Sequence, residues 1–338
     1  MNACWGFIII EALESALLKA TGIQYNLSEN NLQNLMIEYS NLGVFSLVEG
    51  GNANIATTYL ISWLGPLNET EDQFDELGKI SQVIGSNIHI QNTVLVKPSG
   101  KTRDINLIKR SLIEYGAVTY SLFWDNAYFN SNTSAYYDNS ENNVSHGVLI
   151  VGWDDNYSKD NFKTTPPGDG AFIIKNSWGE EWGDKGYFYL SYYNNIDDNC
   201  EFAFKITNES YNINYQHGIG GEIDSIKFPY YASEFTSIGN DLISAFGTYF
   251  NQTTNYEVKL YINGVLKYEQ EGENEFVGYN TIHLNEKIPV QKEDIIRIEV
   301  KQLNTPITNE SRVVLEENVD FISEDGENWI DASKNLTK

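Results

Sequence analysis

The sequence is poor in cysteine and in basic residues. Its only cysteines are Cys4 and Cys200, and a disulfide between them would consume the one candidate nucleophile, so the chain is not a disulfide scaffold. Lys and Arg together number 22 against 47 Asp and Glu, which gives a net charge of −25. Because so acidic a surface repels polyanions, the composition argues against nucleic acid and anionic membrane surfaces as partners.

Histidines and long apolar runs are also scarce. The 4 His residues are scattered without metal-ligand spacing, so we expect no metal and no cofactor. No run approaches the length that spans a bilayer, and we expect no transmembrane segment. The apolar stretch 5–18 contains Glu11 and Glu14 and lacks a basic flank, which argues against a signal peptide.

The first 206 residues change from helical to strand patterns. Apolar residues at helical spacing predict helices over 5–20, 28–39, 53–64 and about 105–115. Apolar or aromatic runs bounded by Gly, Asn and Asp then predict strands over 118–124, 148–153, 170–175 and 187–193. Helices followed by strands indicate an α+β domain over 1–206.

From about residue 208 the pattern is one of short alternating runs. Strands are predicted over 245–249, 256–262, 281–284, 295–300 and 312–315. Asn263-Gly264, between Leu260 and Leu266, is a strong hairpin signal. The pattern predicts an all-β sandwich over 208–325, followed by a tail or linker over 326–338.

Cys4, His146 and Asn176 are candidates for a nucleophilic site. Cys4 by itself could equally be a small buried hydrophobe, but it begins a predicted helix, where free N–H groups stabilise a thiolate. His146 precedes a buried apolar strand and could accept the thiol proton. Asn176 could orient the imidazole, with Trp178 shielding their hydrogen bond from water. Trp124 could line the cleft or pack in the core, and Cys200 is expected to pack in the core.

At these residues the sequence resembles the papain family of cysteine peptidases. The matching motifs occur in the family's order and are Cys4-Trp5-Gly6-Phe7, 27–32, Gly50-Gly51, 146–153 and 175–179, continuing to Tyr187. The resemblance implies Cys4 as nucleophile, His146 as base and acid, and Asn176 as orienter. It also implies a fold with a helical lobe and a β-barrel lobe. Gly51 would pair with an extended peptide, and Gly50, Ser145 and Trp178 are further substrate-binding candidates.

The chain departs from this pattern in three places. The family's oxyanion-hole Gln lies shortly before the Cys, and residues 1–3 contain none. We therefore expect the peptidase domain to lack its N-terminal start and its activity to be impaired. The family's usual disulfides are absent, and the segment 154–170 is long enough to overhang the cleft. The trailing region loosely resembles the lectin-like sandwich of some microbial members.

These observations predict a cysteine endopeptidase that acts on proteins or peptides through an acyl-enzyme. The acidic composition and the sandwich favour an extracellular or cell-surface location. One alternative is a degenerate homologue that binds a glycan or cell-wall polymer through the sandwich. Another is a thiol amidase that cleaves cell-wall crosslinks.

Overall fold

The computed structural model describes residues 3–36, 51–75, 80–96, 104–140, 142–195, 201–217, 223–308 and 316–334. Each predicted helix has a counterpart within these ranges, and residues 37–39 of the helix predicted over 28–39 lie outside the described residues. The α-helices are α1 (Cys4–Thr21), α2 (Glu29–Met36), α3 (Ala53–Ile61) and α4 (Ile105–Glu114). Short 3₁₀ turns are η1 (Lys159–Asn161) and η2 (Ala332–Lys334).

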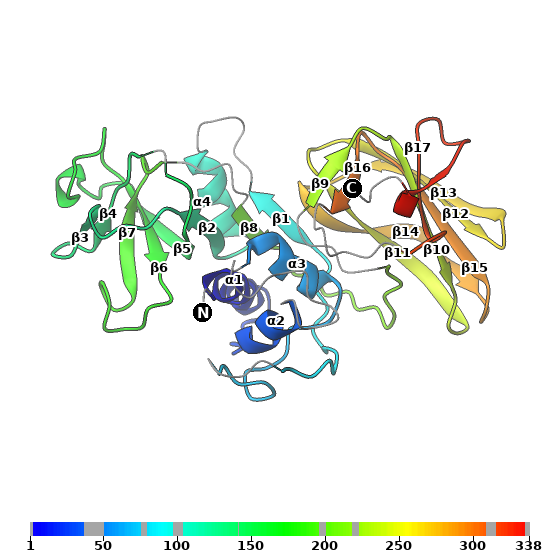
Figure 1. The fold of residues 1–338 in the computed structure, drawn as a ribbon, viewed down its shortest axis with the longest axis horizontal. Helices are drawn as coiled ribbons and strands as arrows, with labels where there is room; N and C mark the ends of the chain where they lie inside the picture. The colour runs from blue at the N-terminus through cyan, green and yellow to red at the C-terminus, as the bar shows by residue number, and fades with distance from the viewer. Residues whose placement is uncertain are drawn as a thin grey trace.

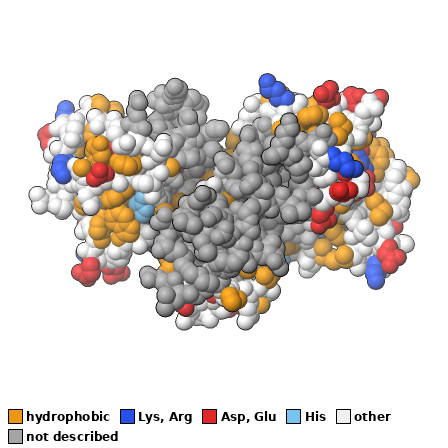
Figure 2. Space-filling view, in the orientation of Figure 1, with side chains coloured by type: hydrophobic (Ala, Val, Ile, Leu, Met, Phe, Trp, Pro, Cys, Tyr) orange, Lys and Arg blue, Asp and Glu red, His pale blue; other side chains and the backbone are white. Residues whose placement is uncertain are grey.

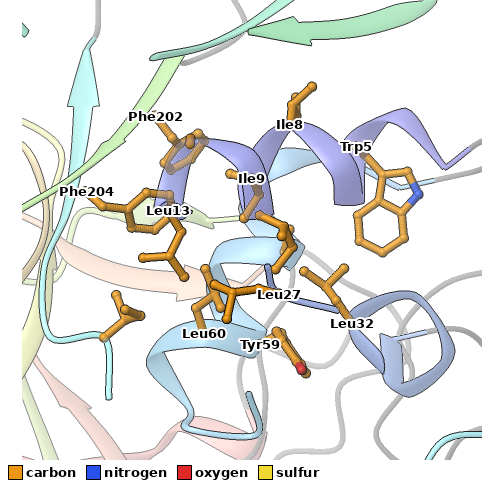
Figure 3. Packing of buried hydrophobic residues seen from close by; sticks show 14 of the residues in the cluster. Trp5, Ile8, Ile9, Leu13, Leu27, Leu32, Tyr59, Leu60, Phe202 and Phe204 are labelled. Carbon is orange, nitrogen blue, oxygen red and sulfur yellow. The ribbon is translucent and has the colours of Figure 1, made fainter. Parts of the chain in front are cut away.

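Helix α1 is the centre of the helical lobe. Gly22 ends it in the left-handed conformation, and the Gly22 N–H donates to Leu18 O at 2.8 Å. Apolar residues cover almost the whole circumference of the helix, as expected of a buried helix. Figure 3 shows α1 packed against α2 and α3 below it and against Phe202 and Phe204 at its side.

The second lobe is a sheet of order β2-β5-β6-β7-β4-β3. Its strands are β2 (Val118–Leu122), β3 (Phe129–Asn130), β4 (Ala135–Tyr136), β5 (His146–Asp154), β6 (Ala171–Lys175) and β7 (Tyr187–Ser191). One face of β5 contributes Val148 and Ile150 to the core of this lobe, whereas Leu149 packs into the core around α1. In Figure 1, α1 accordingly lies between this sheet and helices α2 and α3.

The C-terminal part is a β-sandwich. One sheet has the order β13-β12-β15-β10-β17-β18, the other pairs β11 with β14, and side chains from both form one core. The strands are β9 (Ile223–Ile226), β10 (Tyr230–Thr236), β11 (Asp241–Phe250), β12 (Asn255–Ile262), β13 (Val265–Glu273), β14 (Gly278–Val290), β15 (Ile295–Lys301), β16 (Thr305–Thr308), β17 (Asp320–Ser323) and β18 (Ile330–Asp331). The predicted Asn263-Gly264 hairpin is confirmed, since it joins β12 to β13 with positive φ at both residues.

A continuous sheet connects the peptidase-like part to the sandwich. Strands β1 (Thr93–Val96) and β8 (Glu201–Phe204) extend the sheet of β11 and β14, in the order β11-β14-β1-β8. Gly278 lies at this junction with φ of 122°, and a Cβ there would lie 2.0 Å from Thr93 O. Tyr249 and Tyr279 from the sandwich pack against the core around α1. The sheet therefore crosses the predicted domain boundary near residue 207.

The structure differs from the sequence predictions in two of the connecting and terminal segments. The segment 154–170 joins the end of β5 to the start of β6. His146 and Asn176 lie at the opposite ends of these two strands, so the expectation that the segment overhangs the cleft is wrong. The predicted tail, 326–338, contains β18, which pairs with β17. The strand predicted over 312–315 lies outside the described residues.

Charged side chains are scattered over the described residues on the side of the molecule shown in Figure 2. On the side shown in Figure 2, acidic side chains are dispersed and the few basic ones lie apart from each other. Within the described part of the chain, no helix is long and apolar enough to cross a membrane.

Substituting Gly278 by Ala should loosen the joint between the two parts. The new Cβ would collide with Thr93 O, and φ is positive. We expect Gly278→Ala to lower the free energy of unfolding by more than about 2 kcal/mol, measured by urea denaturation. Gly264→Ala is the matched control: its φ is 76° but no atom lies within 4 Å of the added Cβ, so about 1 kcal/mol is expected. An equal decrease in the free energy of unfolding for the two variants would show that close packing of Gly278 against Thr93 does not stabilise the junction.

Glu29 should make stability depend on pH. Burial, together with nearby Glu14, Glu69 and Glu11, raises the pKa of Glu29 from 4.5 to about 8. Because the folded-state pKa is the higher one, its stabilising contribution is complete below pH 4.5 and is lost as pH rises through 8. Glu29→Gln should therefore raise the free energy of unfolding at pH 8 by about 2 kcal/mol. This figure is smaller than the pKa shift alone would give, because part of the carboxyl group is in contact with solvent.

The control for this titration is Glu71→Gln in the same lobe. Hydrogen bonds from Asn68 lower the pKa of the exposed Glu71, so its linkage lies at acid pH. Its substitution should leave the fall in stability between pH 5 and 8 unchanged. A Glu29→Gln variant with the wild-type pH dependence over this range would contradict the prediction.

Candidate active site

Cys4 is the first residue of α1. Its thiol is free and half-buried, and the first turn of the helix contains no acidic residue. The N–H groups of Gly6 and Phe7 are directed to Ala3 O, at 2.9 and 3.2 Å, which defines the start of the helix. A sulfur at this position meets the positive end of the helix dipole, and no nearby like charge in the first turn opposes a thiolate.

Strand β5 lies directly on this first turn. A Cβ added at Gly147 would approach Ile8 Cδ1 to 2.9 Å and Cys4 O to 3.6 Å. The first distance would require the tip of the Ile8 side chain to shift, and the second is an ordinary van der Waals contact. Strand β5 at Gly147 therefore lies against the first turn of α1, and His146, one residue earlier, begins its strand beside the start of that helix.

The imidazole of His146 is held by Asn176. His146 Nε2 lies 2.8 Å from Asn176 Oδ1, and the Ser177 N–H donates to the same oxygen at 2.9 Å. The Ser177 contact identifies this atom as the amide oxygen, which can only accept. His146 must therefore carry its proton on Nε2, which leaves Nδ1 able to accept a proton.

Burial lowers the pKa of His146 below its ordinary value of 6.5, and the hydrogen bond that the ring donates to Asn176 Oδ1 opposes this only in part. His146 is 8% exposed and Asn176 is 5% exposed, so both the ring and its partner are largely removed from water. The ring is consequently neutral near pH 7 in the absence of an adjacent anion. A neutral imidazole is the form that can take a proton from a thiol.

An aromatic cluster covers the His146–Asn176 pair. Trp178 stacks on the His146 ring, with centroids 4.7 Å apart and planes at 18°. Trp124 meets Trp178 edge to face at 4.9 Å and Trp182 at 5.5 Å. It also stacks on Tyr136 at 4.6 Å. Trp124 thus fixes the ring that shields the hydrogen bond.

An ion pair connects the two sides of the site. Lys175 Nζ lies 2.9 Å from Glu11 Oε1, and both side chains are partly buried. Glu11 is on α1, two turns after Cys4, and Lys175 immediately precedes Asn176. The contact therefore ties the helix that carries the thiol to the strand that directly precedes Asn176.

The structure places the predicted site residues as follows. Cys4, His146 and Asn176 lie at the start of α1, the start of β5 and the end of β6, and Trp178 covers the last two. Gly51 backs onto Trp5, because a Cβ there would lie 2.5 Å from the indole. Ser145 is exposed, and its Oγ accepts from the Trp124 N–H at 3.0 Å. Gly50 and Cys200 lie outside the described residues.

Two contributors were not predicted as such from the sequence. The role of Trp124 depends on the pairing of Leu122 with His146, which no local pattern reveals. The only sequence signal for the Glu11–Lys175 ion pair was the presence of a glutamate, Glu11, within an otherwise apolar helix. Among the described residues, no group of three or more His, Cys, Asp or Glu side chains is arranged to hold a metal ion.

A family model described as papain family cysteine protease matches residues 2–210. The chain therefore belongs to the papain family of cysteine proteases. It is 26% identical over 206 residues to cathepsin L of Sarcophaga peregrina, covering 60% of this chain and 56% of that protein. It is 31% identical over 198 residues to mouse cathepsin K, covering 56% and 53% respectively. The chain thus spans just over half the length of these relatives.

Two solved structures share the fold of almost the whole chain. A clostridial cysteine protease, Cwp84 after propeptide cleavage, is 23% identical with a TM-score of 0.84, covering 98% of this chain and 90% of that one. A structure of the cysteine protease and lectin-like domains of Cwp84, a surface layer associated protein of Clostridium difficile, is 22% identical with the same TM-score of 0.84. It covers 99% of this chain and 80% of that one. The fold is therefore a papain-like unit followed by a β-sandwich.

Removing Trp124 should hydrate the His146–Asn176 pair. We expect Trp124→Ala to raise the pKa of His146 toward its ordinary value, because burial is the main cause that lowers it. The variant should also lose about 3 kcal/mol of stability. The pKa is measured by NMR of labelled histidine.

Trp153→Ala is the control, since Trp153 is also partly buried but lies near the far end of β5. It should leave the His146 titration unchanged. The same titration curve in the wild type and in Trp124→Ala would mean that Trp124 does not shield the pair.

Proposed function

We propose that the chain is a cysteine endopeptidase that hydrolyses peptide bonds through Cys4, His146 and Asn176. The observation that carries the proposal is the hydrogen bond from His146 Nε2 to Asn176 Oδ1, which leaves Nδ1 as a base beside the helix that begins at Cys4. Membership of the papain family and the free thiol at a helix N-terminus support it.

The proposed reaction has two stages. His146 takes the thiol proton, and the Cys4 sulfur attacks the scissile carbonyl carbon to give a tetrahedral oxyanion. The N–H groups of the first helical turn lack intrahelical acceptors, so the Cys4 N–H can donate to that oxygen. The imidazolium then protonates the departing amine, and a thioester forms. His146 next removes a proton from water, which attacks the thioester and releases the acid and the free thiol.

Asn176 and the aromatic cluster act by positioning. The amide oxygen keeps the ring in one orientation as it gains and loses a proton. Trp178 and Trp124 exclude water from that hydrogen bond, which strengthens it. Gly51 would leave backbone open to pair with an extended substrate, because no side chain fits between it and Trp5.

We further propose that the sandwich binds a glycan or cell-wall polymer and that the protein works outside the cell or at its surface. Support comes from the fold shared with the lectin-like domain of a surface layer associated protein. The dispersed acidic surface is compatible with this location.

The direct test combines labelling with hydrolysis. The chain should react with an epoxide thiol probe at Cys4 and should cleave a quenched fluorescent peptide. Cys4→Ala should abolish both, and His146→Ala should slow labelling at pH 6 at least about tenfold, because no imidazolium then stabilises the thiolate. A chain whose labelling is independent of His146 would contradict the proposed site. Labelling without cleavage of any peptide would instead favour an amidase or a binding protein.

A further inference from the structure

The segment 205–217, called the connector below, follows β8 and leads toward the sandwich without forming a helix or a strand. Side chains attach it to the peptidase unit. Gln91 Nε2 donates to Glu209 O at 2.5 Å. Further along, Gln216 of the connector donates from Nε2 to Ser62 O, just after α3, at 2.9 Å. Side-chain hydrogen bonds, rather than a backbone ladder, therefore hold the connector in place.

Two histidines contact the connector within three residues of each other, one from each part of the molecule. His89 lies before β1 in the peptidase unit, and its Nδ1 is 3.2 Å from Tyr211 O. His283 lies on β14 of the sandwich, and its Nε2 is 2.7 Å from Glu209 Oε2. Its Nδ1 also contacts the Tyr211 hydroxyl. The stretch 209–211 is therefore held by one imidazole from each side of the junction.

The two contacts of the His89 ring require two protons. Its Nε2 lies 2.9 Å from Ser86 O, and its Nδ1 faces Tyr211 O. A carbonyl oxygen only accepts, and a neutral imidazole carries a single N–H, so a neutral ring directs a lone pair at one of these oxygens. Protonation completes both hydrogen bonds. The ring also stacks on Trp63, with centroids 3.9 Å apart and planes at 1°, and an indole face attracts a cation.

The group around His283 likewise gains a hydrogen bond on protonation. The Tyr211 hydroxyl lies 3.2 Å from Glu209 Oε2 as well as beside His283 Nδ1. Burial and the adjacent Glu209 raise the pKa of Tyr211, so its hydroxyl keeps its one proton. When His283 is neutral with its proton on Nε2, Nδ1 and Glu209 compete for that proton. When His283 is protonated, both ring nitrogens donate, and the tyrosine proton is left for Glu209.

The charge that faces these rings comes from the connector. Among the described residues, the printed partners of His89 are two carbonyl groups and the Trp63 ring, all uncharged. Opposite His283 in the sheet lies Ala245 of β11, and Gln270 of β13 donates to His283 O at 3.2 Å. These two neighbours are also uncharged. Glu209 is therefore the carboxylate that pairs with His283.

We propose that His89 and His283 form a proton-dependent clasp that holds the connector tightly when both imidazoles are protonated and less tightly when they are neutral. Because protonation adds a hydrogen bond at each ring, this stabilisation is present in acid and is lost as the pH rises and the imidazoles release their protons. The sheet β11-β14-β1-β8 needs no such proton, so the clasp controls the connector and not the whole junction. The inference does not depend on the chemistry of Cys4.

Hydrogen exchange of the full chain, read by mass spectrometry at pH 5.5 and pH 7.5, tests the clasp. After correction for the intrinsic exchange rate at each pH, the protection of amides in 205–217 reports local opening of the connector. The two pH values lie on either side of the ordinary range of imidazole and above that of carboxyl groups. We expect protection to be at least about fivefold greater at pH 5.5, the factor that one net hydrogen bond supplies.

Three variants make the result specific. Glutamine keeps an N–H donor but takes up no proton, so His89→Gln and His283→Gln should each reduce the ratio of protection at the two pH values. The double variant should bring this ratio to about one. Gln216→Ala is the matched control, because it removes an uncharged contact of the same connector from an exposed position. It should lower protection equally at both pH values and keep the wild-type ratio.

Equal protection of the wild-type connector at pH 5.5 and pH 7.5 would overturn the inference. A wild-type ratio in the double variant would also overturn it, and so would a Gln216→Ala variant whose ratio falls as far as that of the histidine variants. His283 is exposed, so His283→Gln should fold even if His89→Gln does not. In that case a wild-type ratio in His283→Gln alone would contradict the clasp.

Discussion

The close contact between the first turn of α1 and the start of β5 is the constraint on which the site depends. At Gly147 the strand lies against this turn, since a Cβ there would be 2.9 Å from Ile8 Cδ1 and 3.6 Å from Cys4 O. Through it, a thiol at a helix N-terminus and an imidazole at a strand end, 142 positions apart in the sequence, lie on adjoining elements. The Glu11–Lys175 ion pair adds a second tie between α1 and the strand that positions Asn176.

The sandwich is joined to the peptidase unit by structure as well as by chain. Strand β1 pairs with β14 at Thr93–Tyr279 and Val94–Gly278, and Tyr249 and Tyr279 pack onto the core around α1. The same core contains Ile9 and Leu13 of the helix that carries Cys4. Motion of the sandwich relative to the helical lobe would break backbone hydrogen bonds and expose these aromatic rings. The two parts are therefore expected to move together.

The sequence predicted most of what is local. Helical spacing located α1, α3 and α4, and Asn263-Gly264 located the β12–β13 hairpin, because period and turn chemistry are written in neighbouring residues. Motifs singled out Cys4, His146 and Asn176, and the hydrogen bond between the last two is present. What escaped prediction is non-local. Nothing in the short run 93–96 indicates that it pairs with β14, almost 190 residues later. The end of the sheet at which the segment 154–170 lies depends on the direction of β5 and β6, which the sequence of the segment does not reveal.

The place of Trp124 illustrates the same limit. Its residue type allowed either a core or a cleft position, and only the register of β2 with β5 sets it against Trp178 and His146. Local sequence patterns could not identify residues whose position depends on cross-strand pairing. They did identify candidate site residues that lie within recognisable motifs.

The central claim is that Cys4 and His146 act as a coupled pair, and titration of His146 by NMR in the wild type and in Cys4→Ala tests it most directly. Burial alone lowers the pKa of His146, whereas an adjacent thiolate would stabilise the imidazolium and raise it. The account predicts that Cys4→Ala makes the His146 pKa fall. An unchanged His146 titration in Cys4→Ala would contradict the coupling, and with it the proposed site.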